Sequence, residues 1–322
     1  MKGKKVSLHK KWFTLALFVF TSFLAGCEQI AVLDPIGPVG ESQKNLILYA
    51  VIFMLGIIVV VYTIFAVVVF KYRANNPNRK ESDYKPEQHG NALIETIWIT
   101  IPVLIVIALS IPTINTIFAL EEPPESSNDK EPIVVYATAA DWKWIFSYPE
   151  QDIETVNYLH IPTDRAVEFR LSSTEAMASF WVPQLGGQKY AMAGMENTLY
   201  LQADEEGVYK GRNANFTGEG FAAQTFNVHT QSEDEFNEWA ENVQNEAPEL
   251  TQSEYDEIIA PGLTDEMAYS GTHLDFVDHG SNDGRDYAVE RHAEKYGEEI
   301  HLENEPGFAP DEINEEQKEG SE

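Results

Sequence analysis

The sequence predicts a two-helix transmembrane hairpin, then an all-β domain, then a small C-terminal helical extension. Two uncharged stretches, 46–70 and 96–120, are each 25 residues long, which is enough to cross a bilayer as a helix. After residue 131 the pattern changes to short apolar segments of period two, separated by turns that contain glycine, proline or aspartate. A row of such segments is typical of a β-sandwich or barrel.

Residues 1–26 have the composition of an export signal. A lysine-rich start is followed by an apolar run over 12–24 and then by Leu24-Ala25-Gly26-Cys27, which is the order found in a signal peptide with a small-residue cleavage site. A cysteine that closes the signal is typical of a bacterial lipoprotein, in which the thiol takes a diacylglycerol. We therefore expect lipidation of Cys27 and an outer N-terminal segment over 27–45. The alternative is a chance thiol in a first membrane span.

Cys27 is the only cysteine in the 322 residues. Once acylated, it leaves no thiolate for metal binding or nucleophilic catalysis. A disulfide within the chain is impossible, so the exported domain depends on its own apolar core.

The loop between the two spans predicts the orientation in the membrane. Five cations stand in the loop 71–92, which the positive-inside rule assigns to the cytoplasm. The spans 46–70 and 93–120 then leave both the N-terminal segment and the C-terminal domain outside. Pro102 and Pro112 interrupt the second span, which membrane helices tolerate where neighbouring helices satisfy the freed carbonyls. We expect a multi-pass protein of a bacterial cell membrane with its main domain on the outer face.

A linker over 121–131, rich in proline, serine and charge, leads into a predicted β-domain over 132–229. Strands are expected in four segments that alternate or run apolar, namely 133–137, 142–148, 166–171 and 198–201.

Beyond the β-domain the pattern becomes helical, and we expect a helical extension over 230–300. Ser232 and Glu235 have the spacing of a capping box, ahead of Phe236 and other apolar residues on one helical face. The acidic end, 301–322, has few apolar residues and is expected to be disordered.

The charge is distributed unevenly along the chain. The balance is +4 up to residue 120 and −34 after it. A strongly acidic domain repels phosphate, so nucleic-acid binding is disfavoured. The charge is explained either by solubility or by an acidic docking face for a cationic partner.

Several motifs, in order along the chain, resemble subunit II of the haem–copper respiratory oxidases. The second span starts with Glu95-Thr96-Ile97-Trp98, and an aromatic strand contains Asp141-Trp142-Lys143-Trp144. A later strand and turn read Trp181-Val182-Pro183-Gln184-Leu185-Gly186, and 207–211 resembles the approach to the loop that closes the family's copper site. The resemblance implies a cupredoxin-like Greek-key fold for the all-β domain.

Copper-bearing members of that family hold two coppers with two cysteines, two histidines, a methionine and a backbone carbonyl beside a glutamate. Such a soft ligand set suits copper that changes oxidation state. In this sequence the first histidine position is Ala178, the cysteine positions are Asn213 and Thr217, the glutamate is Asn215, the second histidine is Phe221 and the methionine is Gln224. The resemblance therefore implies that this chain binds no copper and no other cofactor.

Loss of these ligands is the mark of the quinol-oxidising branch, and the sequence is most similar to subunit II of aa3-type menaquinol oxidases of Gram-positive bacteria. The resemblance implies a complex that oxidises quinol and reduces dioxygen to water with proton pumping. The haems and one remaining copper are expected in a partner subunit I, which also makes the main quinol contacts. The other oxidase subunits and the quinol pool of the membrane are the further partners expected.

Two alternatives remain open at this point. A cytochrome c oxidase subunit is favoured only by the acidic domain and is opposed by the missing copper ligands. A stand-alone membrane lipoprotein with a β-sandwich binding module would leave the motif from Glu95 to Pro102 unexplained.

Glu95 is the candidate for a role in proton transfer. By resemblance it matches a glutamate at the mouth of one proton pathway into subunit I, and an ionisable group at the membrane boundary can collect protons from water. The alternative is an acid in the first turn of a helix, which the helix dipole stabilises without any further role.

The other aromatic and histidine residues are expected to be structural. Trp142 and Trp144 stand where copper-bearing relatives receive electrons, and without copper we expect them to pack in the domain core. His160 and His229 are expected to be isolated residues beside strands. The remaining histidines are expected in a mobile acidic tail without metal-binding spacing, namely His273, His279, His292 and His301.

Overall fold

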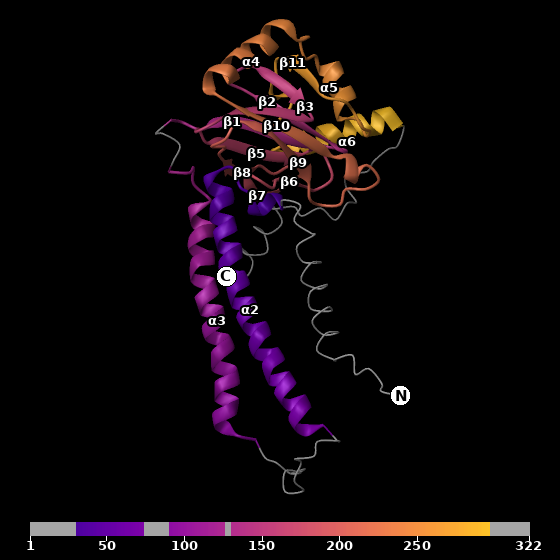
Figure 1. The fold of residues 1–322 in the computed structure, drawn as a ribbon. Coiled ribbons are helices and arrows are strands. Elements are labelled where there is room, and N and C mark those ends of the chain that lie inside the picture. The colour runs from indigo at the N-terminus through magenta and orange to yellow at the C-terminus, as the bar shows by residue number, and fades with distance from the viewer. Residues whose placement is uncertain (1–29, 74–89, 126–129, 297–322) are drawn as a thin grey trace, which may run out of the picture.

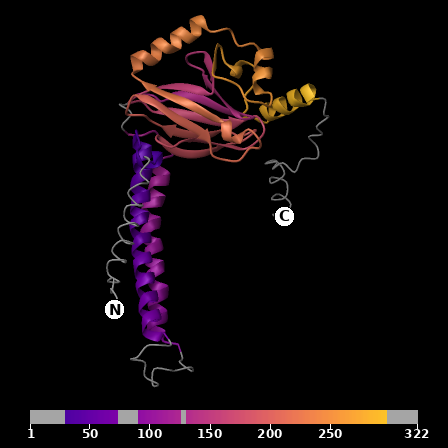
Figure 2. The same ribbon diagram turned by 45° about the vertical axis from the view of Figure 1, so that its right-hand side comes forward.

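The computed structural model describes residues 30–73, 90–125 and 130–296 (Figure 1). Two long helices stand side by side below a β-domain, and the C-terminal elements lie around the upper part of that domain (Figures 1 and 2). The predicted signal, Cys27, most of the loop 71–92 and the tail 301–322 lie outside the described residues.

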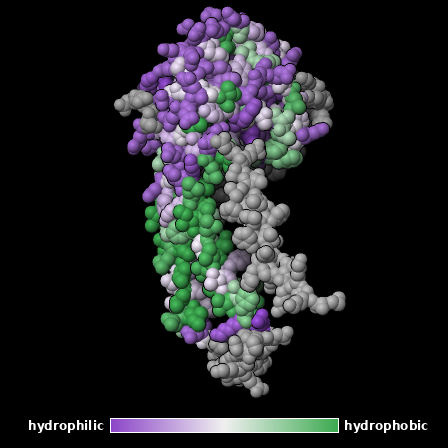
Figure 3. All heavy atoms as spheres, viewed as in Figure 1, coloured by the Kyte–Doolittle hydropathy of each residue, from purple (hydrophilic) through white to green (hydrophobic). Residues whose placement is uncertain are grey.

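The two long helices are α2 (Pro38–Tyr72) and α3 (Ala92–Ala119). Both are long and apolar enough to cross a membrane, by length and composition, and Figure 3 shows the band of apolar side chains that they expose. Asn91 caps α3 by accepting hydrogen bonds from the amides of Leu93 and Ile94, which satisfies two of the free N–H groups at the helix start.

Helix α2 extends beyond the predicted span and joins the β-domain directly. The amide of Ile36 donates to the carbonyl of Gln184 at 2.9 Å, and the carbonyl of Ile36 accepts from the amide of Asp204 at 2.8 Å. Val39, in the first turn, is buried in the same apolar cluster as the domain core. A Cβ added to Gly37 would lie 1.9 Å from the carbonyl oxygen of Gln202, so this contact requires glycine.

The domain is a sandwich of two sheets. The first sheet runs in the order β11 (Met267–Ser270), β3 (Ile153–Val156), β2 (Lys143–Tyr148), β1 (Ile133–Ala140), β5 (Val167–Ser173) and β8 (Asn197–Leu201). The second runs in the order β4 (Tyr158–Pro162), β10 (Thr225–Gln231), β9 (Gly207–Asn213), β6 (Ala178–Val182) and β7 (Gly186–Ala191). The pairs β1–β5 and β4–β10 are parallel and the others are antiparallel. Because parallel partners need a crossover, the chain passes repeatedly between the two sheets.

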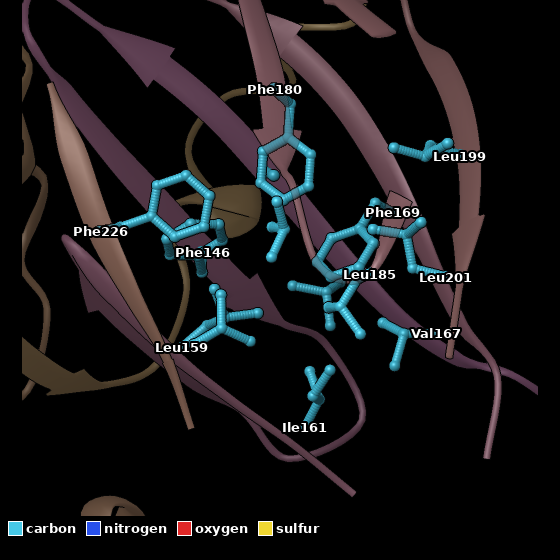
Figure 4. Packing of buried hydrophobic residues seen from close by; sticks show 14 of the residues in the cluster. Phe146, Leu159, Ile161, Val167, Phe169, Phe180, Leu185, Leu199, Leu201 and Phe226 are labelled. Carbon is cyan, nitrogen blue, oxygen red and sulfur yellow. The ribbon is translucent and has the colours of Figure 1, made fainter. Parts of the chain in front are cut away.

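Aromatic side chains from both sheets fill the space between them (Figure 4). The ring of Phe180 lies 5.2 Å from that of Phe226 and 5.0 Å from that of Phe169. Trp144 is fully buried and meets Phe180 edge-on at 5.2 Å. Such pairs contribute about 0.5–1.5 kcal/mol each beyond their buried area. The prediction that Trp144 packs in the core is confirmed.

The C-terminal extension contains α4 (Glu233–Glu246), α5 (Gln252–Ile259) and α6 (Asn282–Tyr296). The capping box predicted at Ser232 is present, and a second one joins Thr251 to Glu254. The predicted helical extension is confirmed, and it also contributes β11, which pairs with β3 and becomes the edge of the first sheet. The extension is therefore part of the sandwich and not an appendage to it.

Candidate functional site

The positions that carry copper ligands in copper-bearing relatives meet at one end of the second sheet. Strand β6 begins at Ala178 and β9 ends at Asn213, which pairs with Phe180, so the two strands bring these positions to the same end of the sheet. The loop 214–224 then carries Thr217 and turns through a short 3-10 helix, Phe221–Ala223, to reach Gln224 just before β10.

Asn213 is the centre of a closed hydrogen-bond network. Its carboxamide oxygen accepts from the backbone amides of Ser179 at 2.8 Å and of Asn215 at 2.9 Å. Its carboxamide nitrogen donates to the side-chain oxygens of Gln224 at 2.8 Å and Thr217 at 3.1 Å. The side chain is buried, so these bonds satisfy groups that water does not reach.

Gln224 closes the same network. Its carboxamide oxygen also accepts from the hydroxyl of Thr217 at 3.1 Å, and its nitrogen donates to the backbone carbonyl of Lys143 at 3.2 Å. Ala178 is also buried, and its methyl group offers neither a donor nor an acceptor. These amides and hydroxyls are neutral, hard groups already bonded to one another, and they do not provide the thiolate and imidazole set that a redox copper pair requires.

The side chains of Asn215 and Phe221 point away from the network, although the backbone amide of Asn215 donates to Asn213. Asn215 donates from its side chain to the carbonyl of Met177 at 2.6 Å, which ties the loop to the residue before β6. Phe221 packs against the ring of Phe216, with a centroid distance of 5.6 Å. The six positions therefore lie on the ends of β6 and β9 and in the loop 214–224, but only Asn213, Thr217 and Gln224 bond to one another through their side chains.

Trp142 holds the outer side of this loop. Its indole nitrogen donates to the carbonyl of Thr217 at 2.9 Å, and a Cβ added to Gly220 would lie 2.3 Å from the indole ring. Trp142 has a φ of 65°, a left-handed conformation that is uncommon outside glycine. Trp142 is half-buried, so the expectation of two core tryptophans is wrong for this one, because it packs on the loop instead of between the sheets.

In the described ranges 30–73, 90–125 and 130–296, no three side chains from His, Cys, Asp and Glu come together in a group that could hold a metal ion. The expectation of no cofactor in this chain stays a prediction, as does the lipidation of Cys27.

Glu95 lies in the first turn of α3. A Cβ added to Gly90 would lie 2.3 Å from a carboxylate oxygen of Glu95, so the side chain folds back beside the residue that precedes the Asn91 cap. The carboxylate is thus at the helix end where the dipole favours negative charge. Its role in proton uptake stays a prediction.

The expectation that His160 and His229 are isolated is wrong. Strands β4 and β10 pair in parallel with these two residues opposite each other, and their rings stack at 4.4 Å. Trp239 of α4 stacks on the other face of His160 at 4.2 Å. Burial lowers the pKa of His160 to about 4, although a hydrogen bond to Gln231 opposes the shift.

A second buried polar cluster was not visible in the sequence as a motif. His273 and His279, expected in a mobile tail, are both almost fully buried. The Nδ1 of His273 lies 2.7 Å from a carboxylate oxygen of Glu154, and Tyr255 stacks on the imidazole of His273 at 4.7 Å. The only sequence signal was a glutamate within the predicted β-domain, which sequence alone does not distinguish from an exposed one.

Two family sequence models match the chain. The model described as cytochrome c oxidase subunit II, transmembrane domain, covers residues 27–116, and the model described as cytochrome c oxidase subunit II, periplasmic domain, covers residues 151–230. Together with the two apolar helices, these matches show a membrane protein with an outer-face domain. The predicted hairpin and cupredoxin-like domain are confirmed.

Relatives match over most of the chain. Quinol oxidase subunit 2 of Bacillus subtilis (strain 168) is 55% identical over 281 residues, 87% of this chain and 87% of its own. Quinol oxidase subunit 2 of Bacillus cereus (strain ATCC 14579) is 48% identical over 267 residues, 82% of this chain and 91% of its own. Among solved structures, the periplasmic domain of subunit II of cytochrome oxidase of Bradyrhizobium japonicum aligns at 19% identity with a TM-score of 0.34, over 35% of this chain and 94% of its own. The chain belongs to the family of oxidase subunit II proteins, in the group named quinol oxidase subunit 2.

Proposed function

We propose that this chain is the copper-free subunit II of a respiratory complex that oxidises menaquinol, reduces dioxygen to water and pumps protons. The observation that supports this most directly is the network around Asn213. At the positions where copper-bearing relatives hold their metal pair, amide and hydroxyl groups satisfy one another. The names of the relatives point to quinol as the reductant.

In this proposal the chain itself carries no redox centre. Partner subunit I holds the haems and one copper, and quinol delivers electrons to it from within the bilayer. A copper relay at the outer surface is then unnecessary, since the reductant does not arrive from water. The helices α2 and α3 brace subunit I, and the β-domain covers its outer face.

Two finer features belong to the same proposal. Acylation of Cys27 anchors the N-terminal segment to the outer leaflet, while the two spans provide most of the membrane attachment. Glu95 collects protons at the cytoplasmic end of α3 and passes them to a pathway in subunit I. Two positions in the sequence support these features: Cys27 closes the predicted signal, and Glu95 stands at the start of the second span.

The proposal is tested on the complex purified in mild detergent through a tag on this chain. We expect a haem-bearing partner to co-purify, copper equivalent to one ion per complex, and oxygen consumption driven by a reduced naphthoquinone but not by reduced cytochrome c. Two additional coppers per complex, or rapid turnover with cytochrome c, would identify a cytochrome c oxidase instead. Purification of the chain without a haem protein would identify a stand-alone lipoprotein.

A further inference from the structure

The two membrane helices form an open groove near the β-domain, with apolar walls and several polar side chains. The groove has a volume of about 760 Å³ and is lined from α2 by Ser42, Asn45 and Tyr49, and from α3 by Asn115 and Thr116. This size is in the range of small-molecule sites, which combine apolar walls with a few polar groups.

A proline in α3 creates part of this polarity. Pro112 has no N–H, so it leaves the carbonyl of Ala108, four residues earlier, without its helical partner. The hydroxyl of Tyr49 reaches across from α2 and donates to that carbonyl at 3.3 Å. The deep end of the groove is therefore closed by a bond between the two helices.

At the end of the groove nearer the β-domain, the described polar side chains are not bonded across the two helices. The side chains of Asn45 and Asn115 are exposed and have no hydrogen-bond partner among the described residues. Asn115 lies four residues from the last residue of α3, which is about 6 Å along the helix axis. Asn115 stands inside the predicted span 93–120, where an exposed carboxamide is costly unless a polar group bonds to it.

The absence of charge among the described residues of the groove limits which kind of polar group can bond to these two carboxamides. None of the described residues that line it carries a charge, so it offers nothing to neutralise a phosphate. Two carboxamides, each able to donate and to accept, match hydroxyl or carbonyl groups on a neutral ring. A hydroquinone head has two such groups and an apolar tail that continues into the bilayer.

We propose that this groove binds the neutral ring of a quinol or quinone, held by Asn45 and Asn115. The inference rests on the proposed function for the identity of the reductant, and adds a binding site on this chain. It makes the groove a place where the reductant enters from the outer leaflet before it reaches subunit I.

The test uses the whole complex and an azido-naphthoquinone as a photoreactive probe. We expect the probe to label peptides of α2 and α3 that carry Asn45 and Asn115, and excess naphthoquinone, but not excess phosphatidylglycerol, to prevent labelling. Asn115→Leu and Asn45→Leu remove the amides at similar volume, and each should weaken labelling and raise the KM for quinol roughly three- to tenfold with little change in kcat.

Thr113→Val is the matched control. Thr113 lies on α3 and bonds to the carbonyl of Leu109 within its own helix, so its loss should leave labelling and KM unchanged. Asn115→Gln, which keeps the amide, should restore part of the labelling. Haem content and co-purification verify that each variant assembles.

Labelling confined to the partner subunits, labelling that phospholipid prevents equally well, or an unchanged KM in both leucine variants would overturn the site. If the wild-type complex oxidises quinol but the groove is not labelled, only this inference fails. If the wild-type complex oxidises no quinol, the proposed function fails, and labelling of the groove then reports a binding site without that reaction.

Discussion

The carboxylate of Glu154 and the imidazole of His273 lie 2.7 Å apart in a region from which water is excluded, although 119 residues separate them in sequence. The same carboxylate oxygen accepts from the hydroxyl of Ser147 at 2.8 Å and from the amide of His273 at 2.9 Å. These bonds attach the C-terminal extension to strands β2 and β3.

Replacing His273 should destabilise this attachment. His273→Ala removes the imidazole that bonds to this buried carboxylate, and losing one hydrogen bond to a buried charged group typically costs about 1–3 kcal/mol. We expect a lower thermal unfolding midpoint for the outer domain and faster hydrogen exchange in β11 and α5. Glu238→Gln, at an exposed glutamate of α4, is the control and should leave both unchanged. An unchanged midpoint in His273→Ala would contradict the prediction.

The stability of the outer domain should fall in acid. Burial lowers the pKa of His279 to about 3, with a smaller effect from His273, and lowers that of His160 to about 4. Tyr255 donates to Nε2 of His279 while Nδ1 donates to the carbonyl of Gly284, an arrangement that requires the neutral ring.

The unfolded chain, with histidine pKa values near 6.5, binds these protons more readily than the folded one. The stability that depends on neutral His160 and His279 is therefore fully present above pH 6.5. The free energy of unfolding then decreases as the pH falls, first toward about 4 for His160 and then toward about 3 for His279. Unfolding midpoints measured from pH 7.5 to 4 should show this decline. In His160→Phe, which keeps the stacking with Trp239, the decline should be smaller, and an identical profile would refute the assignment to His160.

The network around Asn213 should be necessary for the order of the loop 214–224. Asn213→Ala removes the acceptor for the amides of Ser179 and Asn215, and each buried donor left unsatisfied costs about 1–3 kcal/mol. Hydrogen exchange in the loop should increase by at least tenfold. Asn237→Ala, at an exposed position on α4, should leave the loop unaffected.

Glu95→Ala should slow oxygen reduction by the assembled complex and lower the number of protons pumped per electron. The reason is that, in the proposed function, the carboxylate collects protons from water at the cytoplasmic end of α3. Glu95→Asp, which keeps the acid, should retain more activity than the alanine variant. Unchanged turnover and pumping in Glu95→Ala would show that Glu95 interacts with the helix dipole and has no role in proton transfer.

Cys27→Ala should abolish incorporation of labelled fatty acid but leave the protein in the membrane fraction. Two spans bind far more strongly than one lipid anchor. Mass spectrometry of the mature N-terminus checks the modification. Release of the alanine variant into the soluble fraction would show that the lipid provides the main attachment.

The sequence predicts well those features that depend on neighbouring residues. The two spans, the capping box at Ser232 and the alternation of the first strand follow from local periodicity and spacing. Trp144 could be assigned to the core because it stands in an apolar strand.

Features that depend on pairing between distant segments were not predictable in this way. Strand β11 has only four residues and is stabilised by β3, far earlier in the chain. Likewise the residues at the copper-ligand positions could be named from their motifs, but the bonds that Asn213 forms depend on how β6, β9 and the returning loop pack. His160 and His229 lie side by side because β4 and β10 pair in parallel, and the sequence does not indicate that pairing.

The junction between α2 and the sandwich has a mechanical consequence. The amide and the carbonyl of Ile36 both bond to the sandwich, and Val39 is part of its core. The first membrane helix and the outer domain are therefore joined rigidly, without a flexible linker between them. A change in tilt of that helix within the bilayer must rotate the whole extracellular body by the same angle.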